Sequence, residues 1–299
     1  MSELLSLRKI SVWSVIGKIV LLMVLSFLAL LFLDFTSNID LNRINDLYSV
    51  IIYVGTIFIL FRSFKVKGIK REHIIGNVSI RHKGWIKYIS TLLFIMVFSV
   101  FSFLALLYLI TGMYEELIQE VLSTTNEPQN PVGIPILLST FIITVILAPF
   151  AEELLFRGFL FNRWGVTIGL GKAMMISSIV FSLIHFNGGF IGQFIFSIFV
   201  CIIYVKTKKL IIPIILHGLN NLIAMIPEIL DFILYSQTES IKEPDPGELE
   251  QLLNYLRLAL GISTIFFIIL IPIMIYILYR LYPKGVKVTP YEVNKLKSA

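Results

Sequence analysis

Eight long apolar stretches dominate this 299-residue chain and leave it very few folds. A helix needs about 20 apolar residues to cross roughly 30 Å of hydrocarbon, and these stretches come close to that length. The stretches are 12–33, 47–64, 88–112, 135–162, 173–187, 190–205, 210–226 and 258–280. Only 15% of the residues are charged, whereas soluble domains carry about 25%. The sequence therefore predicts an all-α polytopic membrane protein with eight transmembrane helices, and excludes a soluble enzyme, a nucleic-acid module and a disordered scaffold.

The distribution of Lys and Arg predicts how these helices are oriented, because cytoplasmic segments of membrane proteins are enriched in both. If the N-terminus lies inside and eight helices alternate, only Arg43, Lys242 and Arg257 of the 25 basic residues fall in outer segments. We therefore expect both termini in the cytoplasm. Arg8 and Lys9 precede a long apolar stretch without a small-residue cleavage site, so we expect a retained first helix rather than a signal peptide.

The same pattern suggests three parts of the chain. Residues 1–134 are expected to form three transmembrane helices, residues 135–226 a core of four helices, and residues 227–299 an outer loop, the eighth helix and a basic cytoplasmic tail. The polar segment 236–250 contains two prolines and is expected to be a loop. The single cysteine, Cys201, excludes an internal disulfide and a cysteine-rich zinc site.

Ionisable side chains inside the membrane are costly and are functional hypotheses by default. Apart from Lys18, whose long side chain can reach the inner interface, the polar groups of interest fall in three clusters. These are Glu152, Glu153 and Arg157 in the fourth stretch, His185 in the fifth, and His217 with Asn221 in the seventh. Glu152 lies about 16 Å, and His185 about 20 Å, from the nearest basic residue of its helix. Three helices therefore present polar groups near the bilayer midplane.

Spacing along each helix suggests which groups interact. Glu153 and Arg157 are four residues apart with the acid first, which favours an ion pair. Glu152 is turned about 100° from Glu153 and so faces other groups. His217 and Asn221 are also four residues apart and can act on one point. The structural alternative is a set of interhelical hydrogen bonds that only hold the helices together.

These residue types suit two kinds of hydrolytic chemistry. A buried carboxylate with a neighbouring histidine can activate water, while a second histidine and a carboxamide suit a developing oxyanion. Alternatively, Glu152, His185 and His217 match a catalytic zinc site with one open position. Zinc-bound histidines usually have an orienting partner for the second ring nitrogen. Because the sequence supplies no such carboxylate beyond Glu152 and Glu153, chemistry without a metal is favoured.

Three motifs together resemble those of a known family. They are Glu152-Glu153-x-x-x-Arg157, Phe181-x-x-x-His185 and His217-x-x-x-Asn221. The pattern is similar to that of the CPBP intramembrane proteases, also called the Abi family, which include CAAX prenyl endopeptidases and bacteriocin-processing or immunity proteins. The resemblance covers about residues 135–226, roughly the middle third of the chain.

This resemblance implies an eight-helix fold and a membrane-embedded endopeptidase. Glu152 and His185 would activate water, His217 and Asn221 would stabilise the oxyanion, and the charged pair of the first motif would support them. The family was long described as metal-dependent, and a glutamate-protease mechanism competes with that description. We favour the glutamate mechanism and expect no cofactor.

The expected partners are the lipid bilayer and a membrane-associated peptide or protein substrate, and nothing predicts nucleic-acid binding. The Lys-, Ile- and Asn-rich composition indicates a bacterial cell membrane. Bacteria generally lack prenylated CAAX proteins, so a membrane peptide, a pheromone precursor or a bacteriocin leader is the expected substrate. A non-enzymatic transporter or immunity protein is the alternative, although no internal repeat or pore-lining pattern favours a transporter.

Overall fold

The structure, a computed structural model, describes residues 3–36, 41–113, 133–185, 189–234 and 246–298. Every regular element in these ranges is a helix, and none of the described residues forms a strand, which confirms the all-α prediction. The elements are η1 (Glu3–Lys9), α1 (Val12–Thr36), α2 (Leu41–Val66), α3 (Arg71–Ile75), α4 (Trp85–Met113), α6 (Ile134–Phe141), η2 (Ile142–Leu147), α7 (Ala148–Glu153), η3 (Leu154–Phe161), α8 (Asn162–Ile168), α9 (Leu170–Ile184), α10 (Phe190–Thr207), α11 (Ile211–Ala224), α12 (Ile226–Leu234), α13 (Pro246–Leu281) and α14 (Pro290–Lys297). Of these, η1 is a 3-10 helix, whereas η2 and η3 are π-helical.

Seven helical segments among the described residues are long and apolar enough to cross a membrane. They are Val12–Thr36, Arg43–Val66, Trp85–Ile110, Ile134–Ile168, Phe190–Thr207, Ile211–Leu234 and Leu253–Leu281. The fifth expected span corresponds to α9, an apolar helix of 15 residues, so the count of eight stays a prediction. The expected loop is wrong for residues 246–250, because α13 begins at Pro246 and proline is well accepted in a first helical turn. Residues 236–245 of that loop lie outside the described residues.

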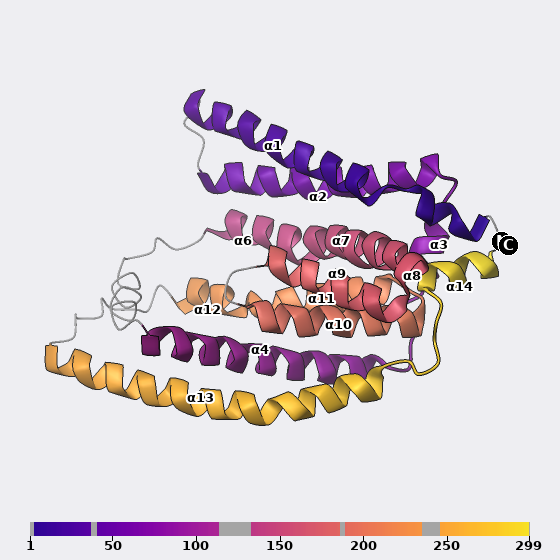
Figure 1. The fold of residues 1–299 in the computed structure, drawn as a ribbon. Coiled ribbons are helices and arrows are strands. Elements are labelled where there is room, and N and C mark those ends of the chain that lie inside the picture. Colours follow the sequence, from indigo (N-terminus) through magenta and orange to yellow (C-terminus); the bar gives the residue numbers. More distant parts are fainter. Residues whose placement is uncertain (1–2, 37–40, 114–132, 186–188, 235–245, 299) are drawn as a thin grey trace.

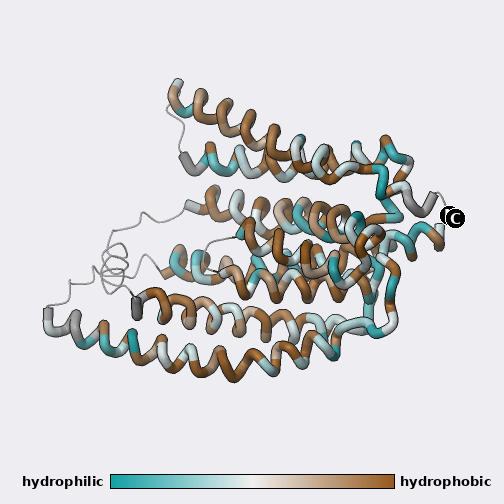
Figure 2. Tube along the Cα trace, in the orientation of Figure 1, coloured by the Kyte–Doolittle hydropathy of each residue, from teal (hydrophilic) through white to brown (hydrophobic). Residues whose placement is uncertain are grey.

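The helices are arranged in layers (Figure 1). α1 packs on α2 along one side and α4 packs on α13 along the other, with the segment from α6 to α8 and helices α9 to α11 between them. The outer helices expose large apolar side chains, such as Leu21 and Phe32 on α1 and Ile265 and Ile268 on α13. Figure 2 shows that apolar residues cover most of their length. Such surfaces are stable in contact with hydrocarbon, so the protein is embedded in a membrane and the middle layer forms its buried interior.

The fourth span is irregular just before its charged residues. Proline has no backbone N–H, and here Pro149 follows Ala148, whose N–H bonds to the carbonyl oxygen of Ile143. The Thr144 carbonyl therefore lacks a donor both from Ala148, four residues on, and from Pro149, five residues on. Asn221 Nδ2 of α11 donates to this oxygen at 2.8 Å. The π-helical turn, a feature often found at functional sites, thus becomes a docking point for α11.

Gly218 brings α11 still closer to η2. A Cβ atom at this position would lie 2.7 Å from the backbone oxygen of Val145, which no larger side chain could accommodate without a shift of the backbone. Because Gly218 directly follows His217, this close approach fixes the position of that histidine against the fourth span.

Both termini lie at the same end of the molecule (Figure 1), where η1, α3, α8 and α14 pack together. The backbone N–H of Tyr291 donates to Asn162 Oδ1 at 3.1 Å, and its hydroxyl hydrogen-bonds Ser6 Oγ at 2.7 Å. The Arg8 guanidinium donates to the carbonyl oxygen of Val166. These bonds tie both ends of the chain to the base of the fourth span. The position of both termini at one end agrees with the expected topology. That this end faces the cytoplasm stays a prediction from the distribution of Lys and Arg.

Candidate active site

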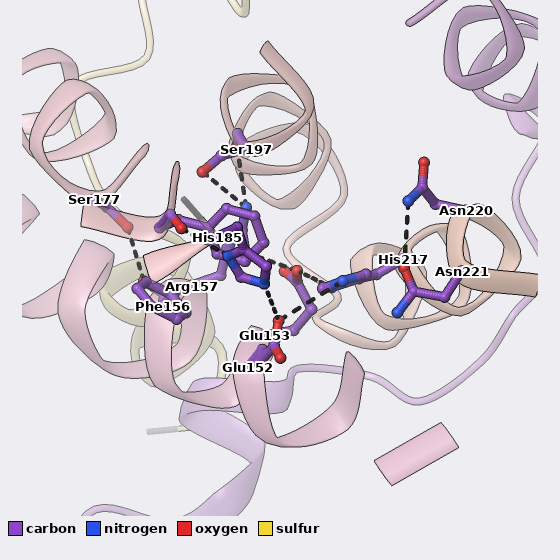
Figure 3. A network of polar contacts seen from close by, with 11 residues as sticks. Glu152, Glu153, Phe156, Arg157, Ser177, His185, Ser197, His217, Asn220 and Asn221 are labelled. Atoms are coloured by element: carbon purple, nitrogen blue, oxygen red, sulfur yellow. Dashed lines mark hydrogen bonds and ion pairs between the residues drawn. The ribbon is translucent and has the colours of Figure 1, made fainter. Parts of the chain in front are cut away.

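Glu152, His185 and His217 converge where α7, α9 and α11 meet (Figure 3). Glu152 Oε2 lies 3.5 Å from His185 Nε2 and 3.8 Å from His217 Nε2. This carboxylate oxygen is buried and has no direct hydrogen-bond partner among the described residues. The three side chains expected at one level therefore do lie together, with one carboxylate oxygen facing two imidazole nitrogens.

His185 lies at the C-terminal end of α9, and the backbone of that helix orients its ring. Nδ1 is 2.8 Å from the carbonyl oxygen of Phe181. A carbonyl can only accept a hydrogen bond, so Nδ1 carries the hydrogen and Nε2 is the acceptor in the neutral ring. The side chain is 26% exposed, against 17% for Glu152 and 5% for His217. His185 is thus the most accessible of the three groups.

His217 is oriented by a carboxylate. Its Nδ1 atom donates to Glu153 Oε1 at 2.9 Å, and its ring makes edge contacts with Phe181 and Phe196. Glu153, one of the two carboxylates that the sequence supplies, is thus the orienting partner of His217, so the lack of such a partner does not disfavour a metal at this histidine. Sequence spacing pairs Glu153 with Arg157, and it does not reveal that the same oxygen also reaches a ring on α11.

The predicted ion pair between Glu153 and Arg157 is confirmed. Arg157 Nη1 lies 2.7 Å from Glu153 Oε1, and both side chains are fully buried. Arg157 Nη2 also donates to Ser197 Oγ of α10 at 2.9 Å, and the guanidinium lies 4.5 Å from the centre of the Phe181 ring. A buried ion pair needs such additional hydrogen bonds to offset desolvation. The ion pair is therefore held in place by α10 and the Phe181 ring, and it supports His217 through the shared Glu153 oxygen.

The side chain of Asn221 makes its hydrogen bonds outside the group formed by Glu152, His185 and His217. Its Nδ2 atom donates to the Thr144 carbonyl, and its Oδ1 atom accepts from Asn220 Nδ2 at 3.3 Å. Among the described residues, no hydrogen bond joins Asn221 to Glu152 or to either histidine of the site. The structure thus brings together three of the four residues assigned to catalysis, and gives Asn221 a docking contact that its spacing from His217 does not predict.

Tyr53 of α2 also lies near the Glu152 carboxylate, and no sequence pattern predicts this. Its hydroxyl is close enough to the Glu152 carboxylate for the two groups to interact electrostatically. α2 packs on α7 and η2, and the buried residues Thr56 and Leu60 lie on the same face of α2 as Tyr53. A lone tyrosine in an apolar helix carries no signal in one sequence, because only the packing of two distant helices creates the contact.

The donor chemistry at this site is acceptable to zinc, since imidazole nitrogen and carboxylate oxygen both bind it. Within the part of the chain that the structure describes, however, no group of three or more His, Cys, Asp or Glu side chains is arranged to hold an ion. The roles assigned to this site are those of the chain's own side chains.

Comparison with known proteins agrees with these features. Residues 134–223 match the family described as type II CAAX prenyl endopeptidase Rce1-like. The chain is also similar to the UPF0177 protein YxdF of Lactococcus lactis subsp. lactis (strain IL1403), with 33% identity over 127 residues. That alignment covers 41% of this chain and 70% of the relative. No solved structure matches.

The fold and the site define a polytopic helical membrane protein with a glutamate and two histidines gathered inside the bundle. The chain belongs to the CPBP family of intramembrane proteases, within which residues 134–223 form the Rce1-like region. At the level of the family, it is a membrane-embedded hydrolase. The matched residues run from the start of α6 to the end of α11, so they contain every group of the site except Tyr53.

Proposed function

We propose that this protein is an intramembrane endopeptidase that hydrolyses a peptide bond of a membrane-associated protein or peptide, without a covalent intermediate. The observation that carries the proposal is the placement of Glu152 Oε2 within 4 Å of the Nε2 atoms of both His185 and His217. In each ring, Nδ1 is already engaged by a fixed acceptor. Both reactive nitrogens therefore point at the same carboxylate oxygen.

Activation of water is assigned to Glu152 and His185. Polar atoms about 3.5 Å apart can share a bridging water, and here one atom is a carboxylate oxygen and the other an imidazole acceptor. A water bound to both would donate one hydrogen to each and keep a lone pair for the peptide carbonyl. Glu152 then takes the proton as the new C–O bond forms, and passes it to the leaving amine.

Stabilisation of the oxyanion is assigned to His217, with Asn221 as the second donor. When protonated, His217 carries an N–H on Nε2, while Nδ1–H stays bonded to Glu153. The Glu153 carboxylate, itself paired with Arg157, accepts the Nδ1–H bond and so holds the orientation of the ring, in the way a buried acid orients a catalytic histidine. Donors fixed in advance inside a low-dielectric site stabilise developing charge more strongly than water does.

The substrate class follows from the surroundings of the site. The site lies inside a helical bundle whose outer surface is apolar, so the scissile bond must be carried by a segment that resides in the membrane. We assign the protein to a bacterial cell membrane, and a membrane peptide, a pheromone precursor or a bacteriocin leader is its substrate.

The test is cleavage by the purified full-length protein in phospholipid vesicles. A library of hydrophobic peptides and a farnesylated CAAX-type peptide serve as probes, with products identified by mass spectrometry. His185→Gln should lower the cleavage rate at least about 10²-fold. His82→Gln, a matched change outside the site, should cleave like the wild type. Absence of any cleavage by the folded wild-type protein, or equal cleavage by His185→Gln, would contradict the proposal.

A further inference from the structure

A second polar site lies between α1 and α2, at the end of the bundle that carries the termini. A pocket of about 400 Å³ opens there. Its lining includes four basic side chains, those of Lys9, Lys18, Arg62 and Lys67. Hydroxyl groups, among them those of Ser11 and Ser14, also line it. No acidic residue is among the lining residues. We refer to this hollow as the α1–α2 basic pocket.

The charges of this pocket are not neutralised within the protein. None of its four basic side chains forms an ion pair or a side-chain hydrogen bond with any of the described residues. Other basic residues at the same end are engaged: Arg163 donates to the Ile10 carbonyl at 3.1 Å, and Lys209 donates to the Ser79 carbonyl at 2.9 Å. Like charges gathered around one hollow repel one another, so the pocket is suited to an anion.

The position of the pocket favours an anion that belongs to a lipid. Lys18 lies within the first membrane span, more than one turn beyond its start at Val12. Next to the pocket, α1 and α2 expose apolar side chains, among them Leu21 at 56% and Phe58 at 63% exposure. Val15 also contributes apolar surface to the pocket wall. An acyl chain can therefore follow the helices while its phosphate occupies the polar end.

We propose that the α1–α2 basic pocket binds the phosphate-bearing headgroup of an anionic phospholipid. Basic pockets between transmembrane helices recognise such headgroups, and each Lys or Arg near the surface contributes to the attraction. The serine hydroxyls supply hydrogen-bond donors for phosphate oxygens. The inference concerns lipid binding alone and does not depend on the proposed peptidase activity.

The test measures lipid binding to the full-length protein in neutral detergent by native mass spectrometry and by thermal unfolding. The probes are phosphatidylglycerol, phosphatidylcholine and inorganic phosphate. We expect phosphatidylglycerol to bind and to raise Tm, with little effect of the other two. Lys18→Gln combined with Arg62→Gln should weaken phosphatidylglycerol binding about tenfold or more. Lys172→Gln combined with Lys287→Gln removes the same charge outside the pocket and should leave binding unchanged.

Three results would overturn the proposal: equal loss of binding in both double variants, equal affinity for phosphatidylcholine, or equal affinity for inorganic phosphate. The last result would identify a site for the free anion rather than for a lipid. If the glutamine double variant fails to fold, Lys18→Arg combined with Arg62→Lys keeps the charge of the pocket. That variant must bind phosphatidylglycerol, and its affinity must fall as salt screens the charges; tight binding that is insensitive to salt would contradict the inference.

Discussion

Glu153 Oε1 is shared by two partners: it accepts from His217 Nδ1 at 2.9 Å and from Arg157 Nη1 at 2.7 Å. A single buried carboxylate oxygen therefore connects Arg157 of the fourth span to the His217 ring, which faces Glu152. The neighbouring glutamates consequently have separate tasks. Glu152 faces the accessible side of the site, whereas Glu153 fixes the tautomer and the orientation of His217 from the buried side.

Removal of the guanidinium should damage folding more than chemistry. Arg157→Ala leaves the Glu153 carboxylate buried without its cation, which typically costs about 3–5 kcal/mol. Thermal unfolding in detergent should show a clearly lower Tm, whereas Arg280→Ala, at an exposed arginine, should not. Glu153→Gln combined with Arg157→Gln should be milder than the sum of the single changes. Additive losses of stability would mean that the two residues do not act as a pair.

The spacing of charged residues predicts this pair correctly, because an i,i+4 relationship is a property of a single helix. The convergence of Glu152, His185 and His217 could also be predicted. The distance of each residue from the basic residues of its own helix indicates a similar depth for all three. The bond between Glu153 and His217 could not. It depends on the rotation and close approach of α11, which Gly218 permits against Val145.

The π-helical turns around α7 were not predicted either. The missing N–H of Pro149 is visible in the sequence, yet the choice between a kink and a wider turn depends on a partner for the freed Thr144 carbonyl. That partner, Asn221, lies on a helix more than seventy residues away. The network at the termini, including the bond from Tyr291 to Asn162, is likewise a long-range contact with no local pattern.

Asn221 has a structural and a proposed catalytic task, and a substitution can separate them. Asn221→Ala removes the bond to Thr144, which should lower stability by about 1 kcal/mol. If the amide also stabilises the oxyanion, turnover should fall about 10²–10³-fold. The check is to measure Tm and kcat of the same preparation, with Asn254→Ala, at an exposed asparagine of α13, as the matched control. A lower Tm with unchanged kcat would assign Asn221 to docking alone.

Tyr53 should act as a positioning residue for Glu152. Tyr53→Phe keeps the ring and removes only the hydroxyl that interacts electrostatically with the Glu152 carboxylate. A hydrogen bond to a charged group is worth roughly 1.5–3 kcal/mol, so kcat should fall about tenfold or more. KM and Tm should change little. Tyr48→Phe, on the same helix, should behave like the wild type; an equal kcat for the Tyr53 variant would show that the contact is not used.

His73, in α3 outside the spans, should make stability depend on pH. Its side chain is buried, and this burial lowers its pKa, as does the nearby Lys295 ammonium. The unfolded chain then binds a proton more readily than the folded one, so stability falls as pH decreases through about 6.5, the unfolded value. His73→Gln should flatten the decline of Tm between about pH 7.5 and 5.5. A decline as steep as in the wild type would contradict this assignment.

The cleavage rate of the Glu152→Gln variant tests most directly whether Glu152 accepts a proton from water. Glu152→Gln keeps the shape of the side chain and removes its ability to take a proton, while Glu72→Gln makes the same change at an exposed residue of α3. The measurement is the cleavage rate of both variants and the wild type in lipid vesicles, with and without a metal chelator. We expect at least about a 10²-fold loss for Glu152→Gln alone, an unchanged Tm, and no effect of the chelator. Cleavage by Glu152→Gln at the wild-type rate, or activity lost in chelator and restored by zinc, would contradict the account.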